Sequence, residues 1–244
     1  MAERISRMRE KLVNIHIPKT AGTSLRFLIS DALEHSQQES PPVIGIDQPD
    51  LGMLYFQGLA AHAKRVLPRL FQPGLHMLSG HFRYRDIIPV LADRREQISL
   101  VTTLRDPIKR TISDYCYSIS AVHDGQEAFK QAYPTFEHYT QNAGEMNKQF
   151  DFLRPFEDAP LDVTIESALQ NLDFVGLTER FEGDAGQLLE SLGLERLKPR
   201  VINASPNKEH ATRIFDSYHD MLQEVLAPDI ALYEAIAARR RFPR

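Results

Sequence analysis

The stretch NIHIPKTAGTSLRFL, residues 14–28, decides the fold class of this chain. A short apolar run ends in Pro-Lys-Thr, a small turn containing Gly22 follows, and the next residues carry helical spacing. A strand, a glycine-containing turn and a helix in this order are typical of a loop that grips phosphate. In the common P-loop the lysine directly follows the last glycine, whereas Lys19 precedes Gly22 by three positions. The stretch therefore predicts an anion-binding loop that differs from the loop of an ordinary ATPase.

The composition is that of a soluble globular protein with one α/β domain, which we expect to span residues 1–244. Apolar residues make up 42% and charged residues 25%, and the formal net charge of −4 argues against a general nucleic-acid-binding role. Any anionic ligand must therefore be held by a local group of basic side chains. Cys116 is the one cysteine in the sequence, so no intramolecular disulfide can form, which fits a reducing compartment.

The charged N-terminus MAERISRMREKL lacks the apolar region of a signal peptide. No apolar stretch approaches the roughly 20 residues of a membrane span. We therefore expect a cytoplasmic protein, whose oligomeric state the sequence does not indicate.

Hydrophobic patterning alternates predicted strands with predicted helices along the chain. Strands are expected at residues 13–17, 75–81, 98–104 and 174–177. Helices are expected at residues 24–33, 52–70, 106–121 (with Asp106 as N-cap), 164–172 and 179–192, and on either side of Pro228. This order predicts a P-loop-like α/β fold of three layers, in which helices flank a central parallel sheet. We expect a loop at 36–50 and an irregular excursion at 122–160 that shapes a pocket.

Two of the predicted strands are followed by groups suited to bind anions, and open α/β sheets bind ligands beyond the carboxyl ends of their strands. The first set leads into the helix at 24–33 and comprises Lys19, Thr20, Ala21, Gly22, Thr23 and Ser24. It offers backbone N–H groups, hydroxyls and an ammonium, and Gly22 lets the backbone approach a ligand closely. The second set follows the strand at 98–104, where Arg105 can share an anion with Ser113, about 10 Å along the next helix.

The second set also has a structural reading. Three of its residues are expected on one face of the helix at 106–121, namely Lys109, Arg110 and Ser113. In that reading Arg105 pairs with Asp106 or Asp114, and Ser113 is a solvated helix residue. The glycine loop of the first set would likewise be only a structural turn. We call these two sets of anion-binding groups the two anion clamps. Two anion clamps in one chain nevertheless indicate a nucleotide that carries anions at both ends.

The segments IPKTAGTS and TLRDPIKRTISDY resemble the cofactor signatures of sulfotransferases that use 3′-phosphoadenosine 5′-phosphosulfate (PAPS). The resemblance is greatest to the group that includes the heparan and dermatan uronyl 2-O-sulfotransferases and many bacterial proteins. SGHFRYRDI is similar to the segment with that family's catalytic histidine, and FVGLTERFEGDAGQLLESLGL and DIALYEAIAARRRF also resemble family patterns. The resemblance covers most of the chain but is weak at 36–74 and 122–160, where the acceptor would be chosen.

The resemblance implies that PAPS is the co-substrate and that 3′-phosphoadenosine 5′-phosphate (PAP) is the product. No metal is expected, because no His, Cys, Asp or Glu spacing indicates a metal site and direct displacement needs none. The resemblance implies that residues 19–24 bind the 5′-phosphosulfate, with Lys19 beside the departing oxygen, and that Arg105 and Ser113 bind the 3′-phosphate. It also implies direct in-line transfer of the sulfuryl group to an acceptor hydroxyl, which we expect to belong to a carbohydrate. His81, at the end of a predicted strand, is then the base that takes the hydroxyl proton.

Several alternatives stay open. His76 is a less suitable base than His81, and His16 has the phase of a structural residue. Lys208, in a loop at 203–208, is either a cofactor contact or a solvated lysine. The competing functions are a P-loop kinase, in which Asp106 positions magnesium, and a nucleotide-binding module without activity. A lipid, a small metabolite or an amine is an alternative acceptor, and the lack of a membrane anchor suggests a bacterial-type enzyme.

Overall fold

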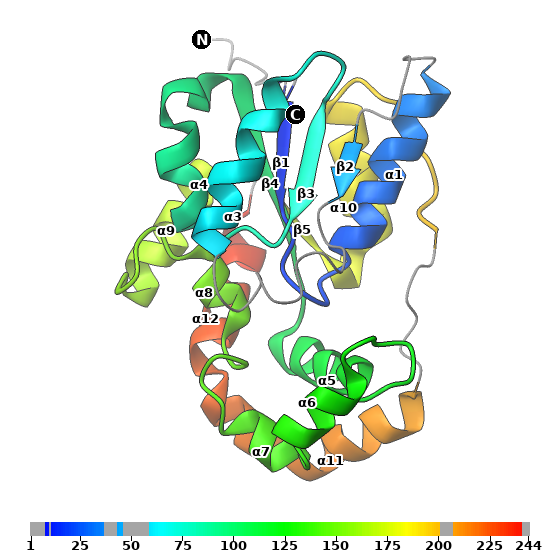
Figure 1. Cartoon of the computed structure of the whole chain (residues 1–244), viewed down its shortest axis with the longest axis vertical. Helices are drawn as coiled ribbons and strands as arrows, with labels where there is room; N and C mark the ends of the chain where they lie inside the picture. The colour runs from blue at the N-terminus through cyan, green and yellow to red at the C-terminus, as the bar shows by residue number, and fades with distance from the viewer. Residues whose placement is uncertain (1–7, 10, 37–42, 46–58, 201–206, 241–244) are drawn as a thin grey trace.

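Five parallel strands form the central sheet in the computed structural model, which describes residues 8–9, 11–36, 43–45, 59–200 and 207–240. The strands are β1 (Lys11–Ile15), β2 (Val43–Gly45), β3 (Met77–Gly80), β4 (Ile98–Leu104) and β5 (Phe174–Leu177). Their order in the sheet is β2-β3-β1-β4-β5, and every neighbouring pair is parallel (Figure 1). The predicted α/β fold with a central parallel sheet is confirmed.

The register brings the carboxyl ends of three adjacent strands to one edge of the sheet. Ile15, the last residue of β1, lies opposite Gly80, the last residue of β3, and opposite Thr102 near the end of β4. From β1 the chain first builds β2 and β3 on one side of the sheet, and then β4 and β5 on the other. The switch point of the sheet therefore lies beside β1, which is where open α/β sheets bind ligands.

Helices cover both faces of the sheet (Figure 1). One face packs against α1 (Gly22–His35) and α10 (Phe181–Ser191). The opposite face packs against α3 (Leu59–Val66), α4 (Tyr84–Leu91), α8 (Lys148–Leu153), α9 (Leu161–Asn171) and α12 (Ala227–Arg239). The strands β3, β4 and β5 are consequently buried along their whole length, as expected for a parallel sheet between two helical layers.

Further helices lie beyond the carboxyl edge of the sheet (Figure 1). They are α5 (Pro107–Ser118), α6 (Gln126–Ala132), α7 (Phe136–Thr140) and α11 (Lys208–Val225). α5 packs with α7 and α11 around a separate apolar core that includes Tyr115, Tyr139 and Ile214. Cys116 belongs to this core, and burial raises the pKa of its thiol to about 11. The cysteine therefore packs as an apolar residue, as predicted.

Local sequence signals explain several of these elements. α1 buries the predicted stripe of Leu25, Leu28, Ile29, Ala32 and Leu33. α5 begins as predicted, because Asp106 Oδ1 accepts a hydrogen bond from the N–H of Lys109 at 2.9 Å and Pro107 occupies the first position. β4 and β5 have the predicted bounds, whereas β1 lies two residues earlier than the predicted strand at 13–17.

Other predictions about the elements are wrong or incomplete. Residues 43–45, predicted as loop, form the edge strand β2, and residues 84–91 form α4, for which no helix was predicted. The range 122–160 contains α6, α7 and α8 instead of being irregular throughout. Of the helix predicted at 52–70, the part before residue 59 lies outside the described residues. The remainder forms α3 and the 3-10 helix η2 (Leu67–Phe71). Further 3-10 helices in the described ranges are η3 (Ala92–Gln97) and η4 (Thr178–Arg180).

Candidate active site

The loop between β1 and α1 has an alternating backbone. Lys19 and Ala21 both have a φ of 67°, in the left-handed region, whereas the φ angles of Thr20 and Gly22 are not positive. Such alternation turns successive N–H groups toward one side and makes a concave anion-binding backbone. Ala21 is also the N-cap of α1 and contributes no side-chain cap, which leaves the first N–H groups of the helix for a ligand. Both features fit the predicted anion loop.

Two sets of contacts hold this loop in place. Thr20 is fully buried, and its hydroxyl donates to the carbonyl of Ile17 at 2.8 Å and lies 3.3 Å from the hydroxyl of Thr103. Arg105 donates from Nη1 to the carbonyl of Lys19 at 3.2 Å. The hydroxyl of Thr20 therefore stabilises the loop itself, and Thr20 can serve an anion through its backbone N–H.

The first turn of α1 lies against His16. A Cβ added to Gly22 would lie 2.0 Å from Cδ2 of the His16 imidazole, which is far inside van der Waals contact. Gly22 therefore makes room for this ring, a reason for the glycine that the sequence did not reveal. Thr23 and Ser24 are partly exposed in the same turn, where their hydroxyls can supplement the N–H groups of the helix.

The ammonium of Lys19 lies over an aromatic ring of α5. Its Nζ is 3.7 Å from the centroid of the Tyr117 ring. Burial lowers the pKa of Lys19; the carboxylate of Asp114 opposes this shift and the guanidinium of Arg105 adds to it. Tyr117 follows Ser113 by one helical turn. Lys19 is thus a largely desolvated cation that reaches the helix carrying Ser113.

Arg105 follows β4 and is held by a residue that the sequence analysis missed. The fully buried side-chain amide of Gln149 accepts from the N–H of Arg105 and donates to its carbonyl, both at 2.9 Å. Burial lowers the pKa of Arg105, while Glu179 and Asp106 oppose the shift. Because Gln149 lies in the first turn of α8, part of the range 122–160 fixes the backbone of the second anion clamp.

Asp229 in turn holds the start of α8. Its carboxylate accepts from the N–H of Gln149 at 3.3 Å and from the N–H of Phe150 at 2.7 Å. Burial raises the pKa of Asp229 to about 6, although Arg110 and the two N–H groups favour the charged form. A buried acid in α12 is thereby connected, through Gln149, to the backbone of Arg105.

The three residues expected on one face of α5 have different environments. Lys109 is exposed, Ser113 is partly exposed and Arg110 is fully buried. Arg110 donates to Asp114 at 3.2 Å, and Asp114 also accepts from Lys148 at 3.1 Å. The placement of Arg110 beside Lys109 and Ser113 is therefore wrong, because its guanidinium stabilises buried charge. In the part of the chain that the structure describes, the hydroxyl of Ser113 makes no hydrogen bond.

His81 directly follows β3 and contacts the segment after β1. Its Nδ1 lies 2.7 Å from the backbone carbonyl oxygen of His16 and donates to it, because a carbonyl only accepts. The neutral ring then carries its lone pair on Nε2, the atom suited to take a proton. The two imidazoles stack with centroids 4.7 Å apart and an interplanar angle of 25°. His16 therefore orients His81, whereas His76 precedes β3, at the opposite end of the strand.

The predicted site residues gather at one edge of the sheet. Lys19, His81 and Arg105 follow β1, β3 and β4, which are neighbours in the sheet. Arg105 contacts the anion loop directly, and His81 contacts the same segment through His16. Lys208 begins α11 with an exposed side chain, and residues 203–206 lie outside the described part of the chain.

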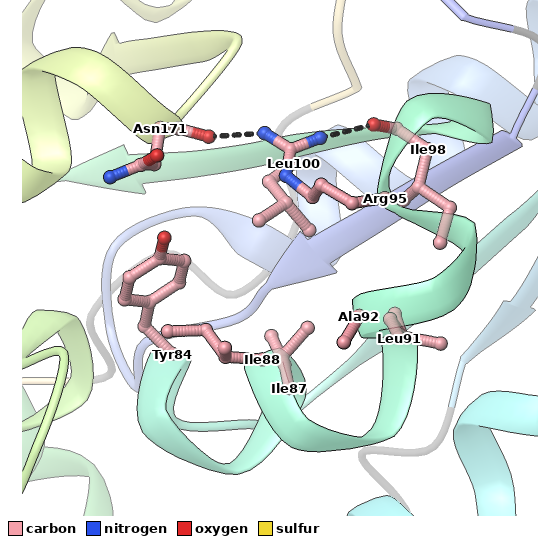
Figure 2. A pocket seen from close by; sticks show the side chains of 9 residues that line it. All are labelled: Tyr84, Ile87, Ile88, Leu91, Ala92, Arg95, Ile98, Leu100 and Asn171. Atoms are coloured by element: carbon pink, nitrogen blue, oxygen red, sulfur yellow. Dashed lines mark hydrogen bonds between the residues drawn. The ribbon is translucent and has the colours of Figure 1, made fainter.

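An apolar pocket lies elsewhere, between α4, β4 and the end of α9 (Figure 2). Its volume is about 260 Å³, and Ile87, Ile88 and Leu91 line the α4 side. The guanidinium of Arg95 donates to the carbonyls of Ile98 at 2.6 Å and Asn171 at 2.7 Å (Figure 2). The lining contains no predicted site residue, so the pocket is separate from the candidate active site.

Comparisons with known proteins bear on the fold. No protein-family model and no curated protein matches the chain. Among solved structures, the sulfotransferase from Alicyclobacillus acidocaldarius has a TM-score of 0.52 at 16% identity, over 96% of this chain and 97% of that one. The chain has the fold of a sulfotransferase. Mouse sulfotransferase SULT7A1 complexed with PAP has a TM-score of 0.40 at 12% identity, over 87% of this chain and 67% of the mouse chain.

None of the helices in the described ranges is long and apolar enough to cross a membrane. The same ranges contain no group of three or more His, Cys, Asp or Glu side chains arranged to hold a metal ion.

Proposed function

We propose that the chain is a PAPS-dependent sulfotransferase that moves a sulfuryl group to an acceptor hydroxyl by direct in-line displacement. One observation carries the proposal: an anion loop, an imidazole and a second cationic clamp follow three adjacent parallel strands at the same edge of the sheet. The sulfotransferase fold supports it, because the structural similarity spans 96% of the chain.

The two clamps fit a nucleotide that is anionic at both ends. In this proposal the N–H groups of residues 19–24 and the ammonium of Lys19 bind the 5′-phosphosulfate. Arg105 and Ser113 bind the 3′-phosphate, which a guanidinium recognises through charge-assisted hydrogen bonds. PAPS supplies an activated sulfuryl group whose leaving group is PAP. Because Arg105 also donates to the carbonyl of Lys19, one side chain couples the two clamps.

The proposed chemistry uses two residues on opposite sides of the sulfuryl group. His81 accepts the proton of the acceptor hydroxyl on Nε2, since the carbonyl of His16 keeps the other proton on Nδ1. The acceptor oxygen forms a bond to sulfur as the bond from sulfur to the bridging phosphate oxygen breaks. Lys19 stabilises the negative charge that develops on this bridging oxygen.

We propose a carbohydrate hydroxyl as the acceptor, and a cytoplasmic enzyme of bacterial type, on the basis of the resemblance described above. The basic residues that follow His81 bear on the kind of carbohydrate. Among the described residues, Arg83 pairs with Asp86 at 2.7 Å and Arg85 pairs with Asp151 at 3.0 Å. Because both guanidiniums are already paired with carboxylates, they are not available to bind an anionic sugar. The segment after His81 therefore favours a neutral sugar over a polyanionic one. The helices of the range 122–160 are the proposed remainder of the acceptor site.

Transfer of labelled sulfate from PAPS to a panel of neutral sugars, uronic-acid polysaccharides, lipids and small metabolites tests the proposal. We expect transfer to at least one hydroxyl acceptor without added Mg²⁺, and transfer slower by about 10²–10⁴ in the His81→Ala variant. Transfer of phosphate from ATP in place of sulfate would support the kinase alternative.

In parallel, PAP should raise the melting temperature more than ADP or AMP does, because only PAP fills both clamps. Equal stabilisation by AMP would contradict the second clamp.

A further inference from the structure

The contact between Lys19 and Tyr117 is the closest cation–π contact among the described residues. The Nζ lies 3.7 Å from the ring centroid, whereas the other described contacts of this kind measure 4.1 Å or more. We infer that Tyr117 is a positioning residue for Lys19: its ring holds the ammonium against α5, the helix that also carries Ser113. The inference rests on the proposed function, to which it adds a residue that no sequence signature assigned.

An aromatic ring positions the Lys19 ammonium for an anionic ligand better than a carboxylate would. A carboxylate beside Lys19 would neutralise the ammonium and compete with an anionic ligand, whereas an aromatic face attracts a cation and leaves its charge intact. Asp114 is the acid that acts on Lys19, and it is engaged by Arg110 at 3.2 Å and by Lys148 at 3.1 Å. Because two other cations engage Asp114, the ammonium of Lys19 remains available to the oxygen that leaves in the proposed reaction.

The surroundings keep both partners in place. Lys19 is anchored at its backbone, where Arg105 donates to its carbonyl at 3.2 Å. Tyr117 lies in the last turn of α5 and packs against the ring of His123, with centroids 5.4 Å apart. Among the described residues, the charged and titratable groups around the ammonium are Asp114 on α5, Arg105 after β4, the phenol of Tyr117 itself and His123 behind the ring. Neither Asp114 nor Arg105 needs to move when the Tyr117 ring is replaced, so the effect of the ring can be measured alone.

The experiment compares the full chain with its Tyr117→Phe and Tyr117→Leu variants. The side-chain signals of Lys19, assigned with a Lys19→Arg variant, are followed by NMR through a pH titration that needs no nucleotide. The wild type and Tyr117→Phe should show upfield ring-current shifts on the ε-methylene protons and the same Lys19 pKa. Tyr117→Leu should lose these shifts and lower the pKa by about 0.5–1.5 units, because the charged form loses the ring while burial persists. Tyr117→Met serves the same comparison if the leucine variant does not fold.

PAP binding then connects the contact to the proposed reaction. We expect Tyr117→Leu to weaken PAP about five- to thirtyfold and Tyr117→Phe to stay within about twofold of the wild type. In a Lys19→Met background, Tyr117→Leu should cause no further loss, because the ring acts through the ammonium. Unchanged Lys19 signals and pKa in Tyr117→Leu would overturn the inference, as would an equal loss of PAP affinity in both backgrounds. Failure of the wild type to bind PAP would instead refute the proposed function, and the NMR comparison distinguishes the two failures.

Discussion

Replacing Gly22 by alanine tests how closely the anion loop and the proposed base are packed together. The added Cβ would lie 2.0 Å from Cδ2 and 2.6 Å from Cγ of His16. A normal contact between carbon atoms is about 3.5–4.0 Å, so the imidazole must move by about 1.5 Å or more. Because this imidazole stacks on His81 with centroids 4.7 Å apart, we expect the substitution to displace the proposed base as well.

The size of the effect follows from two opposing contributions. Overpacking of a well-packed site costs about 1–3 kcal/mol, and alanine regains up to about 1 kcal/mol over glycine in a helix. With a cost in the middle of this range, about 2 kcal/mol, the free energy of unfolding should fall by about 1–2 kcal/mol. For a protein of this size, 1 kcal/mol changes the melting temperature by about 2–4 °C, so a decrease of about 2–8 °C is expected by circular dichroism.

The neighbouring residue offers a matched control. Ala21 has a φ of 67°, which glycine adopts without strain, so Ala21→Gly should leave the melting temperature unchanged or raise it by up to about 4 °C. The double variant His16→Ala, Gly22→Ala should melt at the temperature of His16→Ala alone or up to about 4 °C above it, because the obstructing ring is gone and only the helix preference of alanine remains. A loss from Gly22→Ala that is equally large with and without the His16 ring would refute the steric reasoning.

Three further predictions concern the site and its support. Arg105→Ala should weaken PAP by about 1.5–3 kcal/mol in calorimetric titrations and ADP by clearly less, because ADP loses only the support that Arg105 gives to the carbonyl of Lys19; equal losses would mean that Arg105 does not bind the 3′-phosphate. His81→Ala should lower kcat by about 10²–10⁴ in the labelled-sulfate assay at an unchanged Kd for PAP, and near-normal turnover would exclude it as the base. Asp229 has a pKa raised by burial to about 6, so its folded form binds a proton more tightly than its unfolded form does. The stabilisation that its protonation provides is present at low pH and is lost as the pH rises through 6. The wild type should therefore gain melting temperature between pH 7.5 and 5, and Asp229→Asn should gain less. An equal gain in the two proteins would show that Asp229 does not titrate in this range.

Local signals predicted the elements that carry their own periodicity or caps. β4 is a run of seven buried residues, α1 has an apolar stripe, and α5 has an Asp-Pro start, so each could be predicted from neighbouring residues alone. β2 has three residues and α7 has five, which is too short for a period to be recognised. α4 contains Pro89 within the helix, a residue that usually marks a helix boundary.

In the candidate site, too, some residues could be predicted from local sequence patterns and others could not. Lys19, His81 and Arg105 could be predicted because each directly follows a strand, and strand ends are visible in the sequence. Gln149 is 44 residues from Arg105, and its role depends on a helix whose first turn reaches the end of β4. Tyr117 reads in the sequence as one more aromatic residue of α5. Contacts of this kind are determined by the packing of separate elements, which no local pattern encodes.

The early position of the lysine follows from this packing. A lysine directly after the last glycine belongs to the first turn of the helix and reaches a terminal phosphate. Lys19 instead precedes α1 in left-handed backbone, with its carbonyl bound by Arg105 and its ammonium over Tyr117 of α5. It therefore connects the loop after β1 to the helix after β4, which carries Ser113. If the chain uses PAPS as we propose, a cation in that place lies beside the oxygen that joins phosphate to sulfate, where negative charge develops as the sulfuryl group leaves.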